Sequence, residues 1–501
     1  MRSRTTLAIA ALCALLAAPA ATAGRGPAPA DFDALADIGA RVERIEQYDD
    51  GTGGIHAVIA HSHTAGFAAR EQVGVGILKG RSVLVKDNIE TEEWPTTAGS
   101  LALAENFTRR DAPLIARLRR NGGVVLGKTN LSEWANIRSN DSTSGWSAVG
   151  GLTRNPHAID RNACGSSSGS GAAVAAGMAW GAIGTETNGS ITCPASVNGI
   201  VGFKPSVGIV SRTHIVPISV SQDTAGPMTR TVHDAALLLS AIAGEDPADP
   251  ATLGAERVAD YAEGLDEASL EGVRIGVLRR QAGERADVRA LFDAALADLE
   301  RAGAVLVEVD YETPDDFWAS TLPVLLHELR EGMDAYLAGL PGERGPRSLA
   351  DVVAFNRAER ERELRWFGQD LFERALETTD RAQYEGHLEK IRRMTREEGI
   401  DRLLAEHDVR FLVAPTTGPA WTTDLVNGDS FAGRIGAGYL AAIAGYPHLT
   451  VPMGAVERLP VGLSIMGARW TDHAVLKAGA AYERARTAVL PEPSFKRWKA
   501  D

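Results

Sequence analysis

The chain has 501 residues, with 52 basic and 65 acidic side chains and a formal net charge of −13, so it lacks the basic surplus that a nucleic-acid partner would require. Hydrophobic residues make up 44% and charged residues 23%, a mixture typical of a folded globular protein and not of a disordered or fibrous one. Three cysteines are too few for a disulfide scaffold, and the length suits one large α/β domain or about two to three average domains.

The start of the chain has the pattern of a secretory signal peptide. Arg2 and Arg4 precede an apolar run over residues 7–18, and Ala-Thr-Ala at residues 21–23 forms a small-x-small cleavage pattern. The apolar run is shorter than the ~20 residues that a membrane-spanning helix needs. The sequence therefore predicts a signal peptide over residues 1–23 and a mature protein that is periplasmic or secreted, without stable membrane insertion.

After the signal peptide, the sequence predicts one large domain. Residues 24–69 are expected to be an N-terminal linker and helical segment, and residues 70–501 the domain itself. Its core region, residues 78–230, alternates short apolar runs with Gly and Ser clusters, as at residues 82–85 and 123–126. Runs of this length between turn-forming residues are typical of buried strands.

The later segments indicate how these strands are covered. Alanine-rich residues 171–180 predict a helix whose small side chains allow close packing. Residues from about 312 to 407 are charged, contain few glycines and predict a helical excursion. Residues 409–467 are again apolar and rich in glycine, like the core region, so segments far apart in the sequence are expected to build one sheet. The alternation of strands and helices predicts an α/β fold with helices on both faces of that sheet.

Two motifs in the core region point to chemistries that their surroundings contradict. Residues 122–129 fit the phosphate-loop pattern, but the spacer Gly-Val-Val-Leu favours a strand over a loop that curls around phosphates. Residues 165–169 fit the nucleophile elbow of α/β-hydrolases around Ser167, but the preceding residues 160–164 are polar where the elbow needs a hydrophobic strand. We therefore predict neither a nucleotide site nor a Ser-His-Asp triad.

Three residues in separate segments form a better candidate site. Ser190 ends a turn of small residues at 184–190, where consecutive backbone N–H groups can point at a developing oxyanion. Ser166 lies upstream in a serine-glycine cluster. Lys86 follows the apolar run 82–85, and burial there favours a neutral lysine, which can act as a general base. Taken singly, Lys86 is an ordinary strand-end charge and Ser166 an ordinary helix cap, so the prediction rests on their combination.

These segments resemble the amidase signature family. Its Gly-Gly-Ser-Ser-Gly-Gly-Ser cluster corresponds to residues 164–170, its strand-end lysine to Lys86, and its Asp-x-Gly-Gly-Ser motif to residues 186–190. Residues 130–136 and 144–147 are most similar to the exported bacterial peptide amidases. The resemblance runs from about residue 70 to 470, and its further matches are residues 96–100, 127–130, 199–205, 223–227, 414–417 and 444–447.

Four positions depart from the family motifs. Cys164 and Ser168 stand where the family usually has glycine, Glu186 replaces an aspartate, and Asn188 replaces a glycine but still supplies a backbone N–H. Cys164 and Cys193 lie close in sequence to the two candidate serines. They either pair in an oxidising compartment or remain buried thiols, and we predict no catalytic role for either.

The resemblance implies a fold and a mechanism. The fold is a single large α/β domain with a mixed, mostly parallel central sheet covered by helices on both faces. The reaction is hydrolysis of an amide with release of ammonia, through an acyl-enzyme on Ser190. Ser166, after a cis peptide bond, would relay protons between Ser190 and the base Lys86, with Ser167 in a supporting role at most. The oxyanion would be held by the backbone N–H groups of Thr187, Asn188, Gly189 and Ser190.

The resemblance to peptide amidases implies C-terminal amides of peptides as substrates, and three alternatives remain. One is a general aliphatic or aryl amidase of the same family. Another is the family's member within the multisubunit tRNA-dependent amidotransferase, against which the signal peptide and the acidic charge argue. The third is an inactive binding protein on the same scaffold, which would not need Lys86, Ser166 and Ser190 together.

The sequence predicts neither a cofactor nor a metal site. His61 and His63 form an isolated pair in a glycine- and alanine-rich stretch and are expected at the surface. The helical region 312–407 and the loop at residues 421–431 are expected to line the entrance to the site. Their sequence does not fix the width of that entrance.

Overall fold

A mixed sheet of eleven strands forms the centre of the structure, a computed structural model that describes residues 33–51, 53–342, 345–431 and 435–499. The predicted signal peptide lies outside these residues. The strand order is β1-β3-β2-β8-β10-β9-β14-β15-β13-β11-β12. The strands are β1 (Val58–His61), β2 (Ser82–Lys86), β3 (Val124–Thr129), β8 (Gly181–Glu186), β9 (Val201–Lys204), β10 (Thr224–Thr229), β11 (Arg274–Val277), β12 (Val305–Glu308), β13 (Phe411–Pro415), β14 (His448–Val456) and β15 (Leu459–Met466).

Parallel and antiparallel pairs occupy different parts of this sheet. The strands β3, β2 and β8 pair in parallel, as do β13, β11 and β12. The strands between these two blocks pair antiparallel, and β1 pairs antiparallel with β3 at one edge. Two short hairpins, β4 (Trp146–Ser147) with β5 (Gly151–Leu152) and β6 (Arg154–Asn155) with β7 (Ala158–Asn162), stand outside the sheet.

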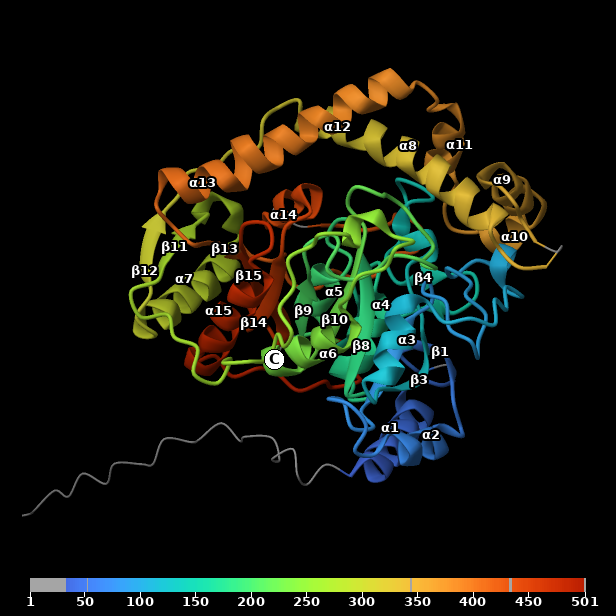
Figure 1. The fold of residues 1–501 in the computed structure, drawn as a ribbon, viewed down its shortest axis with the longest axis horizontal. Coiled ribbons are helices and arrows are strands. Elements are labelled where there is room, and N and C mark those ends of the chain that lie inside the picture. The colour runs from blue at the N-terminus through green and yellow to red at the C-terminus, as the bar shows by residue number, and fades with distance from the viewer. Residues whose placement is uncertain (1–32, 52, 343–344, 432–434, 500–501) are drawn as a thin grey trace, which may run out of the picture. The chain divides into compact units, whose positions relative to one another are not determined.

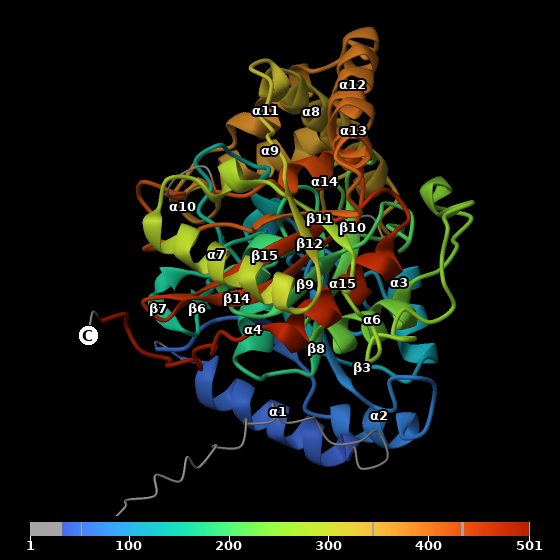
Figure 2. The same ribbon diagram turned by 90° about the vertical axis from the view of Figure 1, so that its left-hand side faces the viewer.

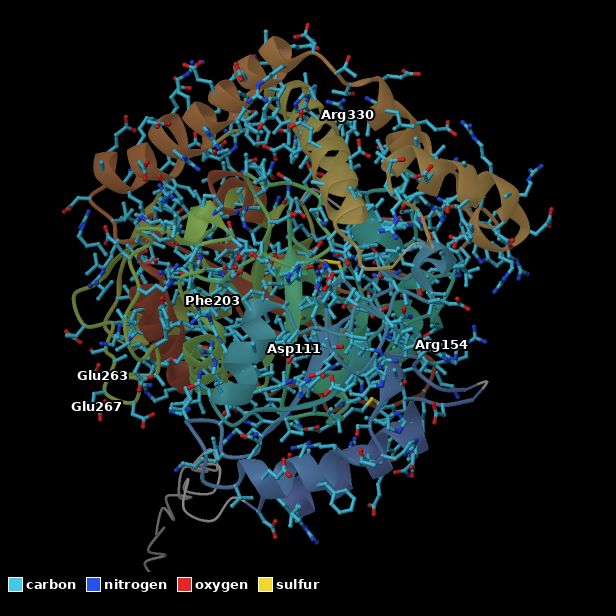
Figure 3. The ribbon with its side chains drawn as sticks, turned by 45° about the vertical axis from the view of Figure 1, so that its right-hand side comes forward. Asp111, Arg154, Phe203, Glu263, Glu267 and Arg330 are labelled. Atoms are coloured by element: carbon cyan, nitrogen blue, oxygen red, sulfur yellow. A yellow bond between two sulfur atoms is a disulfide. The ribbon has the colours of Figure 1, made fainter. Side chains whose placement is uncertain are left out.

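Helices cover both faces of the sheet, which confirms the predicted α/β architecture. In β8, Gly181 lies against Leu238 of α6, whereas Gly184 faces the opposite side and lies against Ser167 at the start of α4. The helices beside the sheet are α3 (Pro113–Arg120), α4 (Ser168–Ala175), α5 (Thr192–Val197), α6 (Val232–Ile242), α7 (Ala286–Arg301) and α15 (Asp472–Ala485) (Figure 1). The core contains Phe203 of β9, whereas Glu263 and Glu267 project at the periphery (Figure 3).

The charged segment after β12 forms a layer of helices away from the sheet. It contains α8 (Phe317–Ala338), α9 (Leu349–Ala358), α10 (Arg360–Glu363), α11 (Asp370–Glu377), α12 (Arg381–Thr395) and α13 (Asp401–Glu406), and α14 (Gly438–Ala444) follows β13. This layer lies at the end of the fold opposite α1 (Ala34–Tyr48) and α2 (Ala65–Gln72) (Figures 1 and 2). A separate apolar cluster under α8, α9 and α11 holds it in place, with Leu329, Leu349 and Phe372 fully buried.

The segment before residue 70 contributes directly to the sheet. The sequence places a linker and helical segment at residues 24–69; the structure contains α1 there, but also β1, which pairs with β3. The described residues from Ala34 onward form one compact unit. No helix within the described ranges is long and apolar enough to cross a membrane.

Candidate active site

The carboxyl ends of the parallel strands β2 and β8 bring Lys86 and Thr185 together, because parallel neighbours end at the same edge of a sheet. Lys86 is the last residue of β2 and is fully buried. Its Nζ donates to Ser166 Oγ at 2.8 Å, to Thr185 Oγ1 at 2.9 Å and to Thr185 O at 3.2 Å. The Lys86 amine therefore has three hydrogen-bond acceptors, none of which is a carboxylate.

The surroundings of Lys86 favour its neutral form. Burial lowers its pKa to about 7, and the more distant carboxylates of Asp223 and Glu186 oppose this shift. At neutral pH a large fraction of the amine is uncharged, because a desolvated ammonium loses its hydration energy. A neutral amine within 2.8 Å of a hydroxyl can accept its proton.

The two candidate serines lie in segments that are hydrogen-bonded to each other. The Ser167 N–H donates to Ser190 O at 3.1 Å, so the residues before α4 lie beside the end of the turn that follows β8. Ser166 follows a cis peptide bond after Gly165, and its carbonyl accepts from the Ser132 N–H at 3.0 Å. Ser166 is fully buried, whereas Ser190 is partly exposed.

Ser167 is fixed in a different direction from Ser166. Its Oγ donates to Thr185 O at 3.1 Å and accepts from the Thr185 N–H at 3.2 Å. These bonds tie the start of α4 to β8. The structure thus gives Ser167 two backbone partners and gives Ser166 the amine of Lys86.

Glu186 braces the turn from its other side. It is buried, and its Oε2 accepts from the N–H groups of Ile191 at 2.8 Å and Thr192 at 3.0 Å, and from Thr192 Oγ1 at 3.2 Å. The carboxylate therefore satisfies N–H groups at the start of α5, which a helix leaves without intrahelical partners. Between these anchors, Gly189 adopts φ +83°, a left-handed conformation that favours glycine.

Thr187 is held by the carboxylate of Asp223, the first residue of a segment that resembles the family, 223–227. Its Oγ1 donates to Asp223 Oδ1 at 2.6 Å, while Asp223 Oδ2 accepts from the N–H groups of Ile218 and Ser219, both at 2.8 Å. Burial raises the pKa of Asp223, and these hydrogen bonds oppose the rise. The turn from Thr187 to Ser190 is thus fixed at both ends before any ligand binds.

Two cavities meet at this turn. One, of about 610 Å³, is lined by Gly165 together with Thr187, Asn188, Gly189 and Ser190. The other, of about 360 Å³, is lined by Ser166, Thr185 and Thr187 and is mostly apolar elsewhere. All six predicted site residues therefore gather in one place, with Lys86 behind Ser166.

A disulfide forms part of the wall of the larger cavity. Cys164 and Cys193 are bonded, with Cα atoms 6.0 Å apart, and both line the cavity. The bond joins the segment before Ser166 to α5. The sequence leaves open whether these cysteines pair or remain buried thiols, and in the structure they pair.

The mouth of the larger cavity is aromatic. Trp318 and Leu325 of α8, Phe431 of the loop and Tyr439 of α14 line it, as expected for the helical region and the loop at 421–431. Trp318 is 52% and Phe431 61% exposed. The loop is anchored by Asp429, whose two oxygens each accept from the Ser144 N–H at 3.1 Å.

Sequence reasoning missed the residues that support the site. Thr185, Asp223 and Asn88, which donates to Thr185 Oγ1 at 3.0 Å, lie in or beside segments that the sequence singles out, but the pattern indicates no role for any of them. The signal available was position, because Thr185 lies near the end of β8, Asn88 two residues after β2 and Asp223 directly before β10. The phosphate-loop look-alike forms β3, and its Lys128 pairs with Asp87 at 2.9 Å in the interior.

Comparisons with known proteins agree with this fold. The model of the amidase family matches residues 38–476. A probable amidase of Arabidopsis thaliana is 38% identical over 436 residues, which cover 84% of this chain and 79% of the relative. One component of the glutamyl-tRNA(Gln) amidotransferase of Mycobacterium bovis is 36% identical over 462 residues, covering 87% of this chain and 90% of that one.

A solved structure is similar over nearly the whole length. The native peptide amidase of Stenotrophomonas maltophilia superposes with a TM-score of 0.87 and 46% identity, covering 93% of this chain and 96% of that one. A second structure of a peptide amidase, in complex with the competitive inhibitor chymostatin, gives a TM-score of 0.88. The family match, the relatives and the shared fold lead to one conclusion: the chain belongs to the amidase family of amidase signature enzymes and is a hydrolase of amide bonds.

Proposed function

We propose that this amidase removes ammonia from the C-terminal amides of peptides by a Ser190, Ser166 and Lys86 relay. Ser190 Oγ attacks the amide carbonyl carbon, its proton passes to Ser166 Oγ, and the Ser166 proton passes to neutral Lys86 Nζ. The backbone N–H groups from Thr187 to Ser190 stabilise the resulting oxyanion. Removing one such donor from an enzyme typically costs ~3–4 kcal/mol of transition-state stabilisation.

The second half of the cycle returns each proton. The C–N bond breaks as Lys86 gives its proton back through Ser166 to the departing nitrogen, which leaves as ammonia. Water then attacks the ester carbon, and its proton follows the same path to Lys86. When the C–O bond to Ser190 breaks, that proton returns to Ser190 Oγ and the carboxylic acid is released.

The observation that carries this proposal is the contact of 2.8 Å between Lys86 Nζ and Ser166 Oγ in a fully buried site. The three hydrogen-bond acceptors of this lysine include no carboxylate, so its role is better explained by proton transfer than by an ion pair. The peptide preference is supported by the similarity to peptide amidases and by the aromatic mouth, which offers apolar contact for a side chain next to the amide.

The test is ammonia release from a peptide amide and from a simple aliphatic amide. We expect rapid release from the peptide amide, and a loss of more than about 10³-fold in the Ser190→Ala and Lys86→Ala variants. Lys204→Met is the matched control, because Lys204 is also fully buried with a pKa lowered by burial, but donates to Pro205 O outside the relay. Circular dichroism checks that each variant is folded.

The other outcomes separate the alternatives. Release only from the simple amide would keep the relay and replace the peptide preference with a general amidase. Activity that survives in folded Ser190→Ala would overturn the assignment of the nucleophile, and Ser167→Ala would then be tested next. Hydrolysis only of free glutamine would favour the amidotransferase-like alternative, which the similarity to the Mycobacterium bovis relative raises.

We propose further that residues 1–23 are removed on export, so that the mature enzyme acts in the periplasm or outside the cell. The support is the pattern of Arg2 and Arg4, the apolar run and the Ala-Thr-Ala site. The disulfide fits an oxidising compartment. N-terminal sequencing of the protein recovered from the periplasm or medium tests it, and a retained Met1 in a cytosolic fraction would contradict it.

A further inference from the structure

Glu46 of α1 comes together with His61, the last residue of the edge strand β1, and with His63 just after it. Their ligand atoms, one from each residue, all lie within 4.8 Å of one another. The two imidazole rings meet edge to face, with centroids 4.7 Å apart. The carboxylate comes from a different element, so the sequence pattern of two histidines acquires a third donor only in the folded chain.

The backbone holds the two histidines in place. His61 ends β1 opposite Gly127 of β3, and the Ser62 N–H donates to Leu126 O at 2.9 Å. The Thr64 N–H donates to Ser62 Oγ at 3.1 Å, which closes a turn after His63. The contact between the two rings and the nearness of both to Glu46 place the imidazoles together on the side of α1.

The helix that carries Glu46 is fixed to the same strand. Asp49, which directly follows α1, accepts from the N–H groups of Ala57 at 2.6 Å and Val58 at 2.9 Å. Ile45, next to Glu46, is buried beneath the helix. Glu46 is exposed and can adjust its side chain, whereas the backbone around it is anchored.

The donor set indicates which cation would fit. His61 Nε2 is buried and has no hydrogen-bond partner in the structure, a condition that is costly for a polar atom. We propose that Glu46, His61 and His63 bind a divalent transition cation of the zinc class. Two imidazole nitrogens and one carboxylate oxygen are the ligands that Zn²⁺ takes in open tetrahedral sites, with water at the fourth position.

The cation would link α1 to the edge of the sheet and stabilise the fold. Strand β3 lies between β1 and β2, which carries Lys86, so the site is separate from the proposed relay. This inference does not depend on the proposed function. It predicts binding and thermal stabilisation, neither of which requires amide hydrolysis.

The test measures Zn²⁺ binding by isothermal titration calorimetry after treatment with EDTA, using zinc chloride alone as the probe. We expect the folded protein to bind zinc and its melting temperature to rise with zinc. His63→Ala and Glu46→Gln should bind one equivalent less and lose the rise in melting temperature. His233→Ala, which removes an exposed histidine on α6, should behave like the unaltered protein.

Co²⁺ provides a second readout, because its visible absorption reports coordination by nitrogen and oxygen ligands directly. The Ser190→Ala variant should bind zinc normally, so a failure of the catalytic proposal and a failure of the metal proposal give different results. The proposal is overturned if no saturable binding occurs, or if folded His63→Ala binds zinc with the same stoichiometry and affinity as the unaltered protein.

Discussion

At the scale of single residues, the site depends on how each polar group is desolvated and partnered. Lys86 and Lys128 are both fully buried lysines on neighbouring strands. Lys128 lies 2.9 Å from the carboxylate of Asp87, whereas Lys86 has only hydroxyl and carbonyl acceptors. The same residue type is therefore an ion-pair partner in one strand and a candidate base in the next.

The state of Lys86 predicts the pH dependence of the reaction. Its pKa of about 7 lies below the ordinary lysine value because of burial, so below pH 7 the amine is protonated and cannot take a proton. We expect kcat/KM to rise with pH through an apparent pKa near 7 and then to level off. Initial rates on a peptide amide from about pH 5 to about pH 9 measure this. A profile that is flat over that range would contradict the role of Lys86 as base.

At the scale of elements, a buried ion cluster connects the helical layer to the site. Arg138 Nη1 contacts Glu133 Oε1 and lies 3.4 Å from Glu363 Oε2, and all three side chains are fully buried. Glu133 begins the short helix η3 (Glu133–Asn136), and Glu363 ends α10. Glu363 also accepts from Ser100 Oγ at 3.0 Å and from the Leu101 N–H at 2.6 Å.

This cluster encloses a strained segment that lines the cavities. Trp134, Ala135 and Asn136 all have positive φ, at 48°, 54° and 71°. A non-glycine residue in this region costs roughly 1–3 kcal/mol, so the surroundings must enforce it. Ala135 lines both cavities and Asn136 the larger one. The cluster therefore positions part of the wall of these cavities, although its own charged groups do not line them.

Removing the central cation should therefore be severe. Arg138→Met leaves the carboxylates of Glu133 and Glu363 buried without their partner, and we expect a loss of about 3–5 kcal/mol in the free energy of unfolding. Urea denaturation measures this. The control is Arg381→Met, because the pair of Arg381 with Glu385 is 71% and 59% exposed and should contribute about 0.5 kcal/mol or less. Equal losses of unfolding free energy in the two variants would show that the buried cluster stabilises the fold no more than an exposed ion pair does.

At the scale of the whole molecule, the entrance is assembled from segments that are far apart in the chain. Trp318 comes from α8, Phe431 from the loop after β13, and Tyr439 from α14, while Ser190 follows β8. Trp318 and Tyr439 have ring centroids 5.3 Å apart. Exposed aromatic side chains at the mouth of a cavity offer apolar surface to a ligand longer than the amide itself.

This arrangement predicts which substrates depend on the entrance. We expect Trp318→Ala and Phe431→Ala to raise KM for a peptide amide with an apolar last residue by roughly fivefold to tenfold, through lost apolar contact. The KM for a simple amide and kcat for both substrates should change little, because neither side chain belongs to the relay. Phe67→Ala is the control, since Phe67 is 70% exposed on α2 and lies outside the cavity lining. An equal rise in KM for both substrates would contradict a role in peptide recognition.

Sequence and structure differ most in where elements begin and what supports them. The alanine-rich stretch predicts a helix over residues 171–180, but α4 begins at Ser168 and ends at Ala175, since Gly177 turns the chain with φ +74° toward β8. The strand β1 is not foreseen, because its four residues are only partly buried at an edge and carry no strong alternation. Short edge elements depend on the strand beside them, which a local pattern does not contain.

The sequence by itself determined the type of fold, the family and the candidate residues Lys86, Ser166 and Ser190, because buried strands, glycine-rich turns and nucleophile motifs are local patterns. The tertiary structure alone decided the disulfide, the brace from Asp223 to Thr187, the cluster around Arg138 and the meeting of Glu46 with His61 and His63. Each of these joins residues from different elements. Whether these residues contact each other depends on their distance and burial in the folded chain. Their spacing along the sequence determines neither quantity.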